Sequence, residues 1–345
     1  MDCIEGRRVL ETLLHTKQPD LHRMTVPSAT GASQDNDTLA SGGENEGLPC
    51  VLSFNAADPV GGGGVVSDAL VIASIGAHAL PITTGVLLRD TREALGHTAL
   101  DHATVAEQAR LVAEDVPVQT IKVGFAGSAE ALAAIAAFSS DYPDAPVIAY
   151  LPDLSWWDEQ AIDDYLDAFR ELLLPQTAVL VGNNATLRHW LLPESASRRQ
   201  TSVTDLARVA SELGVSYVLV TGLPLPGDRI GNVLASPRGE LLHQNFERID
   251  AAFLGAGDIL SAALAALLAC GSDLNEAATE ALQYLDQALD HGFRPGMGRA
   301  VADRLFWAES AQDDSPAGDD PPAEDDATEP ATLHDLHPSP NETKH

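Results

Sequence analysis

The sequence has few cysteines and no spacing of metal-binding residues. Only three of its 345 residues are cysteine, and Cys3, Cys50 and Cys270 stand far apart. This usage fits a reducing compartment and predicts neither a disulfide framework nor a zinc site. The 11 histidines add no H-E-x-x-H or Cys/His pattern. We therefore assign no metal ligand from the sequence.

Basic residues and long apolar runs are also scarce. Lys and Arg number 20 against 51 Asp and Glu, giving a net charge of -31, and no basic cluster occurs. This balance argues against nucleic acid or an anionic membrane as a partner. The apolar run from Ile259 to Cys270 is too short to span a bilayer, and residues 1–16 lack the apolar run of a signal peptide. We expect a soluble, cytoplasmic protein without a membrane partner.

The two ends of the chain are poor in core-forming residues. Residues 1–48 contain a long Ser/Gly/Asn/Asp stretch and are predicted to be mostly disordered. Residues 309–345 are rich in Asp, Glu and Pro, which is typical of a disordered acidic tail, with a functional acidic arm as the alternative. The sequence thus predicts one folded domain over residues 49–308.

Within this domain, short apolar runs of strand type alternate with segments of helical spacing. Strands are predicted at residues 50–54, 79–87, 120–123, 147–150, 178–181 and 217–221, with a hairpin over 231–235 and 241–245. Helices are predicted at residues 64–75, 105–114, 128–139, 159–174, 203–213, 259–270, 274–291 and 299–308, and a short amphipathic one at 5–15. The alternation indicates an α/β fold with a mainly parallel sheet covered on both faces. Ligands of such sheets bind beyond the carboxyl ends of the strands.

Two glycines and a carboxylate precede the most apolar of these helices, in the run Gly255-Ala256-Gly257-Asp258. The first N–H groups of a helix have no intrahelical partner and carry the positive end of its dipole, so a phosphate would bind there. A base at Asp258 could take the proton of a hydroxyl that attacks a phosphoryl group. The alternative is an aspartate that only caps the helix after a glycine turn.

A second glycine-rich run, Gly61 to Gly64, follows the first strand. Glycines at that place serve backbone shape, at a turn or around a flat ligand, whereas a flexible linker is the alternative. Residues 55–70 resemble the G-S-D-P-S-G-G-A-G-I-Q-A-D-L signature of the hydroxymethylpyrimidine/phosphomethylpyrimidine kinases, ribokinase-fold enzymes of thiamine biosynthesis. The matching positions are Asp58, Pro59, Gly61, Gly62, Gly64 and Asp68. Lys122-Val123-Gly124 resembles that family's K-I-G-M, and residues 255–258 are similar to the G-A-G-D of ribokinases, whose aspartate is the catalytic base.

The resemblance covers residues 50–307 and implies a ribokinase-like three-layer α/β/α sandwich. It implies ATP-dependent phosphorylation of the hydroxymethyl group of 4-amino-5-hydroxymethyl-2-methylpyrimidine, or of its monophosphate, in thiamine biosynthesis. ATP, Mg²⁺, a small pyrimidine substrate and a homodimer belong to that expectation.

The implied site has three parts. Asp258 is the catalytic base, beside an anion hole of Gly255, Ala256 and Gly257. The residues implied to bind the substrate are Asp58, Gly61, Gly62, Arg89 and Phe125. Those implied to bind the nucleotide are Asn183, Thr221 and Gly222. Alternatives remain open for two residues: Asp58 could form an Asx turn before Pro59, and Lys122 could form a salt bridge instead of contacting substrate.

The sequence departs from the family pattern at several positions. Arg89 replaces the glutamine of T-A-Q-N-T, and a guanidinium only donates hydrogen bonds where an amide also accepts. The aspartate of V-x-D-P and the glutamate of N-x-x-E are absent, although Asp153 could replace the first. Mg²⁺ in kinases needs only one or two carboxylates besides the nucleotide phosphates. Trp156 and Trp157 are interpreted as structural.

Three functions therefore stay open: a hydroxymethylpyrimidine kinase, a kinase of another heteroaromatic alcohol such as pyridoxal, or a catalytically idle pyrimidine-binding sensor. Asp258 with its glycines favours the first two, and the missing acidic residues favour the third.

Overall fold

The computed structural model describes residues 47–192 and 202–309. The chain divides into two units, Met1–Phe306 and Trp307–His345. The first unit holds the fold and the candidate site, and only residues 307–309 of the second are described. The predicted N-terminal extension, its helix at 5–15 and the acidic tail lie almost wholly outside the described residues and stay predictions.

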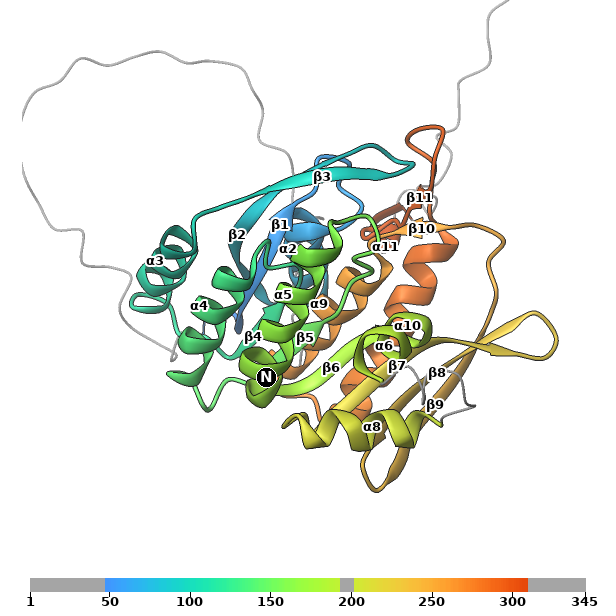
Figure 1. Ribbon diagram of the computed structural model, residues 1–345. Helices are drawn as coiled ribbons and strands as arrows, with labels where there is room; N and C mark the ends of the chain where they lie inside the picture. Colours follow the sequence, from blue (N-terminus) through green and yellow to red (C-terminus); the bar gives the residue numbers. More distant parts are fainter. Residues whose placement is uncertain (1–46, 193–201, 310–345) are drawn as a thin grey trace, which may run out of the picture. The chain divides into compact units, whose positions relative to one another are not determined.

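A nine-stranded sheet forms the centre of the first unit (Figure 1). Its strands, in chain order, are β1 (Cys50–Ala57), β2 (His78–Arg89), β3 (Ala94–Ala99), β4 (Thr120–Val123), β5 (Val147–Tyr150), β6 (Thr177–Asn183), β7 (Tyr217–Leu225), β8 (Arg229–Ser236) and β9 (Gly239–Glu247). Their spatial order is β3-β2-β1-β4-β5-β6-β7-β8-β9. Neighbours from β2 to β7 pair in parallel, and the outer strands β3, β8 and β9 pair antiparallel. The predicted mainly parallel sheet is confirmed.

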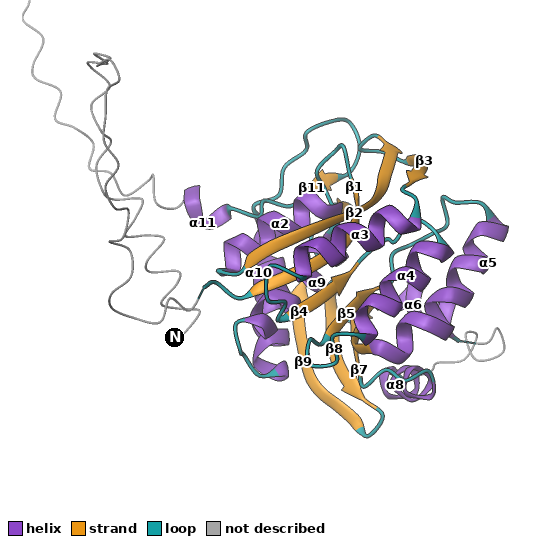
Figure 2. Ribbon diagram, turned by 90° about the vertical axis from the view of Figure 1, so that its left-hand side faces the viewer, coloured by secondary structure: helices purple, strands orange, loops and turns teal. Residues whose placement is uncertain are grey.

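Helices cover both faces of this sheet (Figure 2). On one face lie α2 (Gly64–Ile75), α9 (Ala256–Ala269) and α10 (Leu274–Asp290). On the other lie α3 (His102–Ala113), α4 (Ala129–Ser140), α5 (Glu159–Ala168), α6 (Asn184–Leu191) and α8 (Val203–Glu212). The three-layer α/β/α expectation is met. No helix within the described residues is long and apolar enough to cross a membrane.

Helix α9 lies against the middle of the sheet because its side chains are almost all small or apolar. Every residue from Ile259 to Leu267 is buried, and the helix packs on β1, β4, β5 and β6. Its first turn therefore lies at the carboxyl ends of the central parallel strands, where α/β sheets bind their ligands.

Strand β1 is buried at every position from Cys50 to Ala56. A strand covered on both faces is expected to be apolar throughout. Ser53 and Asn55 break this rule, and their buried polar groups need partners inside the protein.

Several predicted elements differ from the structure. The predicted helix at 299–308 is wrong: Ala300–Val301 forms β11, which pairs in parallel with β10 (Phe253–Leu254), and helix α11 spans only Phe306–Glu309. The α-helix predicted over residues 159–174 ends at Ala168. A π-helical turn, Phe169–Leu173, and a 3₁₀ turn, Leu174–Gln176, follow it. Strand β3 and helix α6 were not predicted.

Candidate active site

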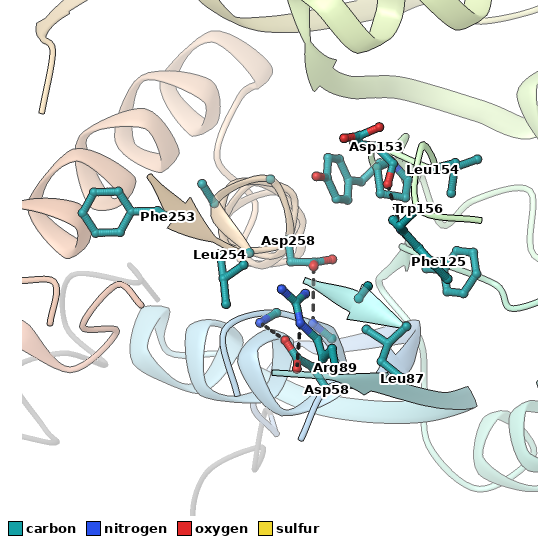
Figure 3. A pocket seen from close by; sticks show the side chains of 18 of the residues that line it. Asp58, Leu87, Arg89, Phe125, Asp153, Leu154, Trp156, Phe253, Leu254 and Asp258 are labelled. Carbon is teal, nitrogen blue, oxygen red and sulfur yellow. Dashed lines mark hydrogen bonds and ion pairs between the residues drawn. The ribbon is translucent and has the colours of Figure 1, made fainter. Parts of the chain in front are cut away.

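A cavity of about 530 Å³ opens at the carboxyl ends of the parallel strands (Figure 3). Most of the residues predicted for the site line it, from segments up to 200 residues apart in sequence. These are Asp58, Arg89, Phe125, Asn183, Thr221, Gly255, Ala256, Gly257 and Asp258. Three predicted residues, Gly61, Gly62 and Gly222, do not line the cavity.

Two glycine segments pack backbone to backbone beside this cavity. A Cβ on Gly255 would lie 1.8 Å from the carbonyl oxygen of Gly62, and the φ of Gly255 is 73°. A Cβ on Gly62 would lie 2.7 Å from the Cβ of Leu254. Gly62 therefore allows the loop after β1 to pack against the start of α9. It does not line the cavity, and its contact with a substrate stays a prediction.

Asp258 contacts other elements and does not cap its own helix. Gly255 is the N-cap of α9, without a side-chain hydrogen bond. The Asp258 Oδ1 accepts hydrogen bonds from Asn55 Nδ2 at 2.7 Å and Lys122 Nζ at 2.9 Å, and its Oδ2 accepts one from the Gly64 amide at 3.3 Å. The capping alternative is thereby excluded. The side chain is 15% exposed and lines the cavity. Its carboxylate is therefore held by protein groups and is still accessible from the cavity.

The amide of Asn55 has a fixed orientation. Its Oδ1 accepts the backbone N–H groups of Ala56 at 3.0 Å and Phe125 at 3.1 Å, so its Nδ2 is left to donate to Asp258. One residue of β1 thus joins the loop after β4 to the carboxylate on α9.

Lys122 is completely buried and lies between two carboxylates. Its Nζ is 2.9 and 2.8 Å from the two oxygens of Asp68 and 2.9 Å from Asp258 Oδ1. Ser53 Oγ and Asn55 Nδ2 donate to the same Asp68 oxygen at 2.7 and 3.0 Å. Lys122 therefore forms the salt bridge that was the alternative to substrate contact, and it does so inside the sheet.

The charges in this network shift the proton affinity of its members. Burial by itself lowers the pKa of Lys122, but the carboxylates of Asp258 and Asp68 outweigh burial and the pKa is raised. Burial raises the pKa of Asp68, and Lys122 opposes that rise. Lys122 therefore stays protonated and supplies the positive charge that compensates the two neighbouring carboxylates, Asp68 and Asp258.

Asp58 shapes the loop between β1 and α2. Its Oδ1 accepts the Val60 amide and its Oδ2 the Gly63 amide, both at 3.0 Å. The Asx-turn alternative is thus realised. Arg89 extends from the end of β2 toward this carboxylate, with its Nε 3.9 Å from Asp58 Oδ1 (Figure 3).

An aromatic wall forms another side of the cavity. Phe125 and Trp156 both line it, with ring centroids 5.6 Å apart. Behind them Trp157 lies 5.3 Å from Phe125, and His97 lies 5.1 Å from it. Such a wall suits a flat ring as ligand. Trp156 was interpreted as structural; its position six residues beyond the end of a central strand is the signal that could have placed it here.

The residues predicted to bind nucleotide lie at the end of β6 and in the middle of β7, where the parallel pairing of the two strands ends. Asn183 and Thr221 are direct partners in the register of these strands. The Asn183 Oδ1 accepts the Ala185 amide at 2.9 Å and so caps α6. A Cβ on Gly222 would lie 2.4 Å from Asn183 Nδ2, so this glycine leaves room for the asparagine.

The carboxylates present fit a magnesium ion held mainly by its ligand's phosphates. No group of three or more His, Cys, Asp or Glu that could hold a metal occurs in the described ranges. Asp153 lines the cavity, and burial together with the charges of Asp258 and Asp153 raises the pKa of Tyr150. Asp153 and Asp258 are carboxylates of the same cavity, and one or two carboxylates are what Mg²⁺ needs beside phosphates.

Sequence reasoning missed much of what holds Asp258 in place. Asn55 and Ser53 were not singled out, and Asp68 was matched to a signature without a role. The available signal was polar side chains inside segments predicted to be buried strands, because such groups require internal partners. Tyr150, Arg92 and Arg299, which also line the cavity, carried no local signal.

The cavity thus holds an ordered carboxylate at a helix N-terminus, beside an aromatic wall and the end of β6. Residues 58–303 match the family model described as phosphomethylpyrimidine kinase. The chain belongs to this family.

Named relatives agree with this assignment. The hydroxymethylpyrimidine/phosphomethylpyrimidine kinase of Streptomyces coelicolor is 28% identical over 275 residues, covering 75% of this chain and 95% of the relative. A thiamine biosynthesis multifunctional protein of Corynebacterium efficiens is 27% identical, and the match covers 77% of this chain but only 36% of that protein.

Solved kinases share the fold. A Bacillus subtilis pyridoxal kinase matches with a TM-score of 0.67 and 20% identity, over 76% of this chain and 99% of that one. A phosphomethylpyrimidine kinase from Clostridium difficile matches with a TM-score of 0.55 and 20% identity, over 68% of this chain and 97% of that one. The ribokinase-like fold expected from the sequence is confirmed.

The contact between Gly255 and Gly62 predicts that a methyl group added at position 255 strongly destabilises the fold. We expect Gly255→Ala to lower the free energy of unfolding by on the order of 4 kcal/mol or more, because the Cβ adds a clash to a left-handed backbone. Gly227→Ala is the matched control: its φ is 76° and its Cβ would meet nothing within 4 Å. That variant should lose only about 1–3 kcal/mol. Equal losses of unfolding free energy in the two variants, measured by urea denaturation, would show that Gly255 and Gly62 are not in tight contact.

The buried position of Lys122 predicts a second large effect. Lys122→Met leaves Asp68 and Asp258 facing each other without a cation, and we expect a loss of about 3–5 kcal/mol in the free energy of unfolding. Lys122→Met combined with Asp68→Asn removes one of the two negative charges and should recover part of that loss. A single variant as stable as the wild type in urea would contradict the role of Lys122.

Proposed function

We propose that the chain is an ATP-dependent kinase of the hydroxymethyl group of 4-amino-5-hydroxymethyl-2-methylpyrimidine, or of its monophosphate, in thiamine biosynthesis. Asp258 carries this proposal: its carboxylate lies in the first turn of α9, faces the cavity and is fixed by Asn55 and Lys122. Membership of the phosphomethylpyrimidine kinase family supports it.

The chemistry follows from the position of Asp258. A primary alcohol is a poor nucleophile at neutral pH, and in-line transfer requires its oxygen near the γ-phosphorus with a base in hydrogen-bond reach. Asp258 takes the alcohol proton. The amides of Gly255, Ala256 and Gly257, at the positive end of the α9 dipole, stabilise charge on the transferred phosphoryl group. Lys122 and Asn55 hold the carboxylate at one oxygen, so it needs no reorientation during the reaction.

The aromatic wall and the strand ends divide the cavity between two substrates. Phe125 and Trp156 pack on the pyrimidine ring, next to β1 and β2. Asn183, at the end of β6, and its register partner Thr221 in β7 bind the ATP. Asp153 helps to hold Mg²⁺, which when bound neutralises charge on the phosphates.

Arg89 favours a second candidate substrate. A guanidinium in the ring pocket suits a carbonyl-bearing ring such as pyridoxal better than a neutral aminopyrimidine, since it only donates hydrogen bonds. We therefore retain a pyridoxal-type kinase as the alternative.

The protein is further proposed to be a cytoplasmic homodimer without nucleic-acid or membrane partners. Sedimentation of the purified protein should give a dimer mass at micromolar concentration. A monomer mass across the accessible concentration range would refute the dimer.

The general-base role predicts the behaviour of Asp258→Asn. The asparagine oxygen can still accept from Lys122 and Asn55, so we expect a folded protein that binds nucleotide. Its kcat on the pyrimidine alcohol should fall by roughly 10²-fold or more, the scale of general-base loss. The measurement is steady-state ATP turnover, with calorimetric nucleotide binding as the control. Near-normal turnover by the variant would refute the assignment. A wild type that binds the pyrimidine without turnover on any ring alcohol would favour a sensor.

A further inference from the structure

The last residue of β5, Tyr150, brings a hydroxyl group to the cavity that the proposed reaction has not used. Tyr150 is in register with Val181 of β6, which also lines the cavity. Its ring lies against the first turn of α9: a Cβ on Gly257 would lie 2.3 Å from the ring carbons Cε2 and Cζ and 2.5 Å from the hydroxyl oxygen. The polar end of the phenol is therefore next to the helix N-terminus that carries Asp258.

Within residues 47–192 and 202–309 no hydrogen bond joins the Tyr150 hydroxyl to another group. Other tyrosines of the protein satisfy this group internally. The Tyr165 hydroxyl accepts the Ala126 amide at 3.1 Å, and the Tyr284 hydroxyl donates to the Arg304 carbonyl at 2.7 Å. A tyrosine hydroxyl that is removed from bulk water normally finds a partner. At the wall of the cavity, the Tyr150 hydroxyl is available to a ligand.

This hydroxyl keeps its proton. Burial raises the pKa of Tyr150, and the negative charges of Asp258 and Asp153 raise it further, because a phenolate would repel both carboxylates. Tyr150 is thus a neutral phenol at every ordinary pH. It offers the cavity a permanent hydrogen-bond donor.

The place of β5 in the sheet puts this donor between the proposed acceptor and the proposed nucleotide. In the order β1-β4-β5-β6, Asn55 of β1 is two strands away from Tyr150, and Asn183 of β6 is one strand away. At about 4.8 Å per strand spacing, these separations are roughly 10 Å and 5 Å across the sheet. In the proposed reaction, the group that lies between the acceptor alcohol and the rest of the nucleotide is the transferred phosphoryl group.

Backbone amides of α9 point to the same group. The amide of Ile259 donates to the Gly255 carbonyl at 2.9 Å, which is the first i to i−4 hydrogen bond of the helix. The amides of Ala256 and Gly257 come before it in the first turn and have no acceptor within the helix. Because the Tyr150 hydroxyl is next to Gly257, the hydroxyl and these amides can donate to one anion.

We propose that the Tyr150 hydroxyl is a further donor of the anion hole and a catalytic residue, which donates a hydrogen bond to the transferred phosphoryl group. This inference deepens the proposed kinase function and rests on it. In the transfer, the alcohol oxygen bonds to the γ-phosphorus, the bond from this phosphorus to the ADP oxygen breaks, and the alcohol proton passes to Asp258. Tyr150 keeps its own proton throughout. A donor already fixed beside the phosphoryl group stabilises its negative charge without reorganisation.

The variant Tyr150→Phe tests the contact, because it removes the hydroxyl oxygen and retains the ring that packs on Gly257. The matched control is Tyr142→Phe: the ring of Tyr142 stacks on Phe138, with centroids 4.7 Å apart, and Tyr142 does not line the cavity. ATP turnover is measured with hydroxymethylpyrimidine or its monophosphate as acceptor. We expect kcat/KM for ATP to fall roughly 10- to 100-fold in Tyr150→Phe, the scale of one hydrogen bond to a charged group. The control should stay within about twofold of the wild type.

Nucleotide binding separates failure of this contact from failure of the kinase proposal. ADP and the β,γ-methylene analogue of ATP are titrated calorimetrically, with Mg²⁺, into the wild type and Tyr150→Phe. The two ligands differ in the terminal phosphate, so we expect the variant to bind the analogue roughly tenfold more weakly and ADP within about twofold. Such selective weakening supports the contact even if the wild type phosphorylates no ring alcohol, in which case the kinase proposal alone fails.

With an active wild type, the kinetics decide. Slower turnover by Tyr150→Phe with unchanged ADP binding supports the contact. Unchanged turnover would overturn it, and faster turnover would show instead that the hydroxyl obstructs the phosphate. Equal weakening of ADP and the analogue would overturn it as well, since the hydroxyl would then affect the nucleotide as a whole. With an inactive wild type, equal affinity of the analogue for wild type and variant would overturn the contact.

Discussion

The buried ammonium of Lys122 is the interaction on which the rest of the site depends. A charge without water requires compensating charge at hydrogen-bond distance, and here two carboxylates supply it, at 2.8 to 2.9 Å. Asp68 belongs to α2, Lys122 to β4 and Asp258 to α9, while Ser53 and Asn55 of β1 complete the hydrogen bonds. One cation thus fixes two strands and two helices relative to each other. Asp258 and Asn55 of this network line the cavity, and the carboxylate of Asp258 is held there in a single orientation.

Glycines allow the N-terminus of α9 to lie next to the cavity. Helix α9 can begin over the central strands only if its first residues approach the loop after β1 more closely than any side chain allows. Gly255 against Gly62, and Gly257 against the ring of Tyr150, where a Cβ would lie 2.3 Å from ring atoms, meet this requirement. Packing of glycines and the buried ion pair therefore act together. The first places the amides of the α9 N-terminus, and the second places the carboxylate of Asp258 at the cavity.

Local patterns in the sequence predicted the sheet, its two covered faces and the motif at residues 255–258, because apolar periodicity and glycine chemistry are local properties. The network behind Asp258 is not local, since Asn55, Lys122 and Asp258 meet only after folding. The predicted helix at 299–308 failed because the tertiary pairing of Ala300–Val301 with Phe253–Leu254 overrides helix propensity there. The same segment carries Arg299 to Thr91, a contact between residues 208 positions apart. The structural interpretation of Trp156 agrees with its packing against the core. Its place in the cavity wall was not foreseen, because its aromatic partners are His97 of β3 and Phe125 of the loop after β4.

The most direct test of the central claim, that a buried ion pair presents Asp258 as the base of a phosphotransferase, is the fate of the pyrimidine alcohol itself. Purified protein is incubated with ATP, Mg²⁺ and hydroxymethylpyrimidine or its monophosphate, and the products are followed by ³¹P NMR. We expect a new phosphate ester or pyrophosphate resonance of the pyrimidine to grow in step with ADP. Binding of the pyrimidine without any phosphorylated product would contradict the claim and favour a protein that senses the pyrimidine without converting it.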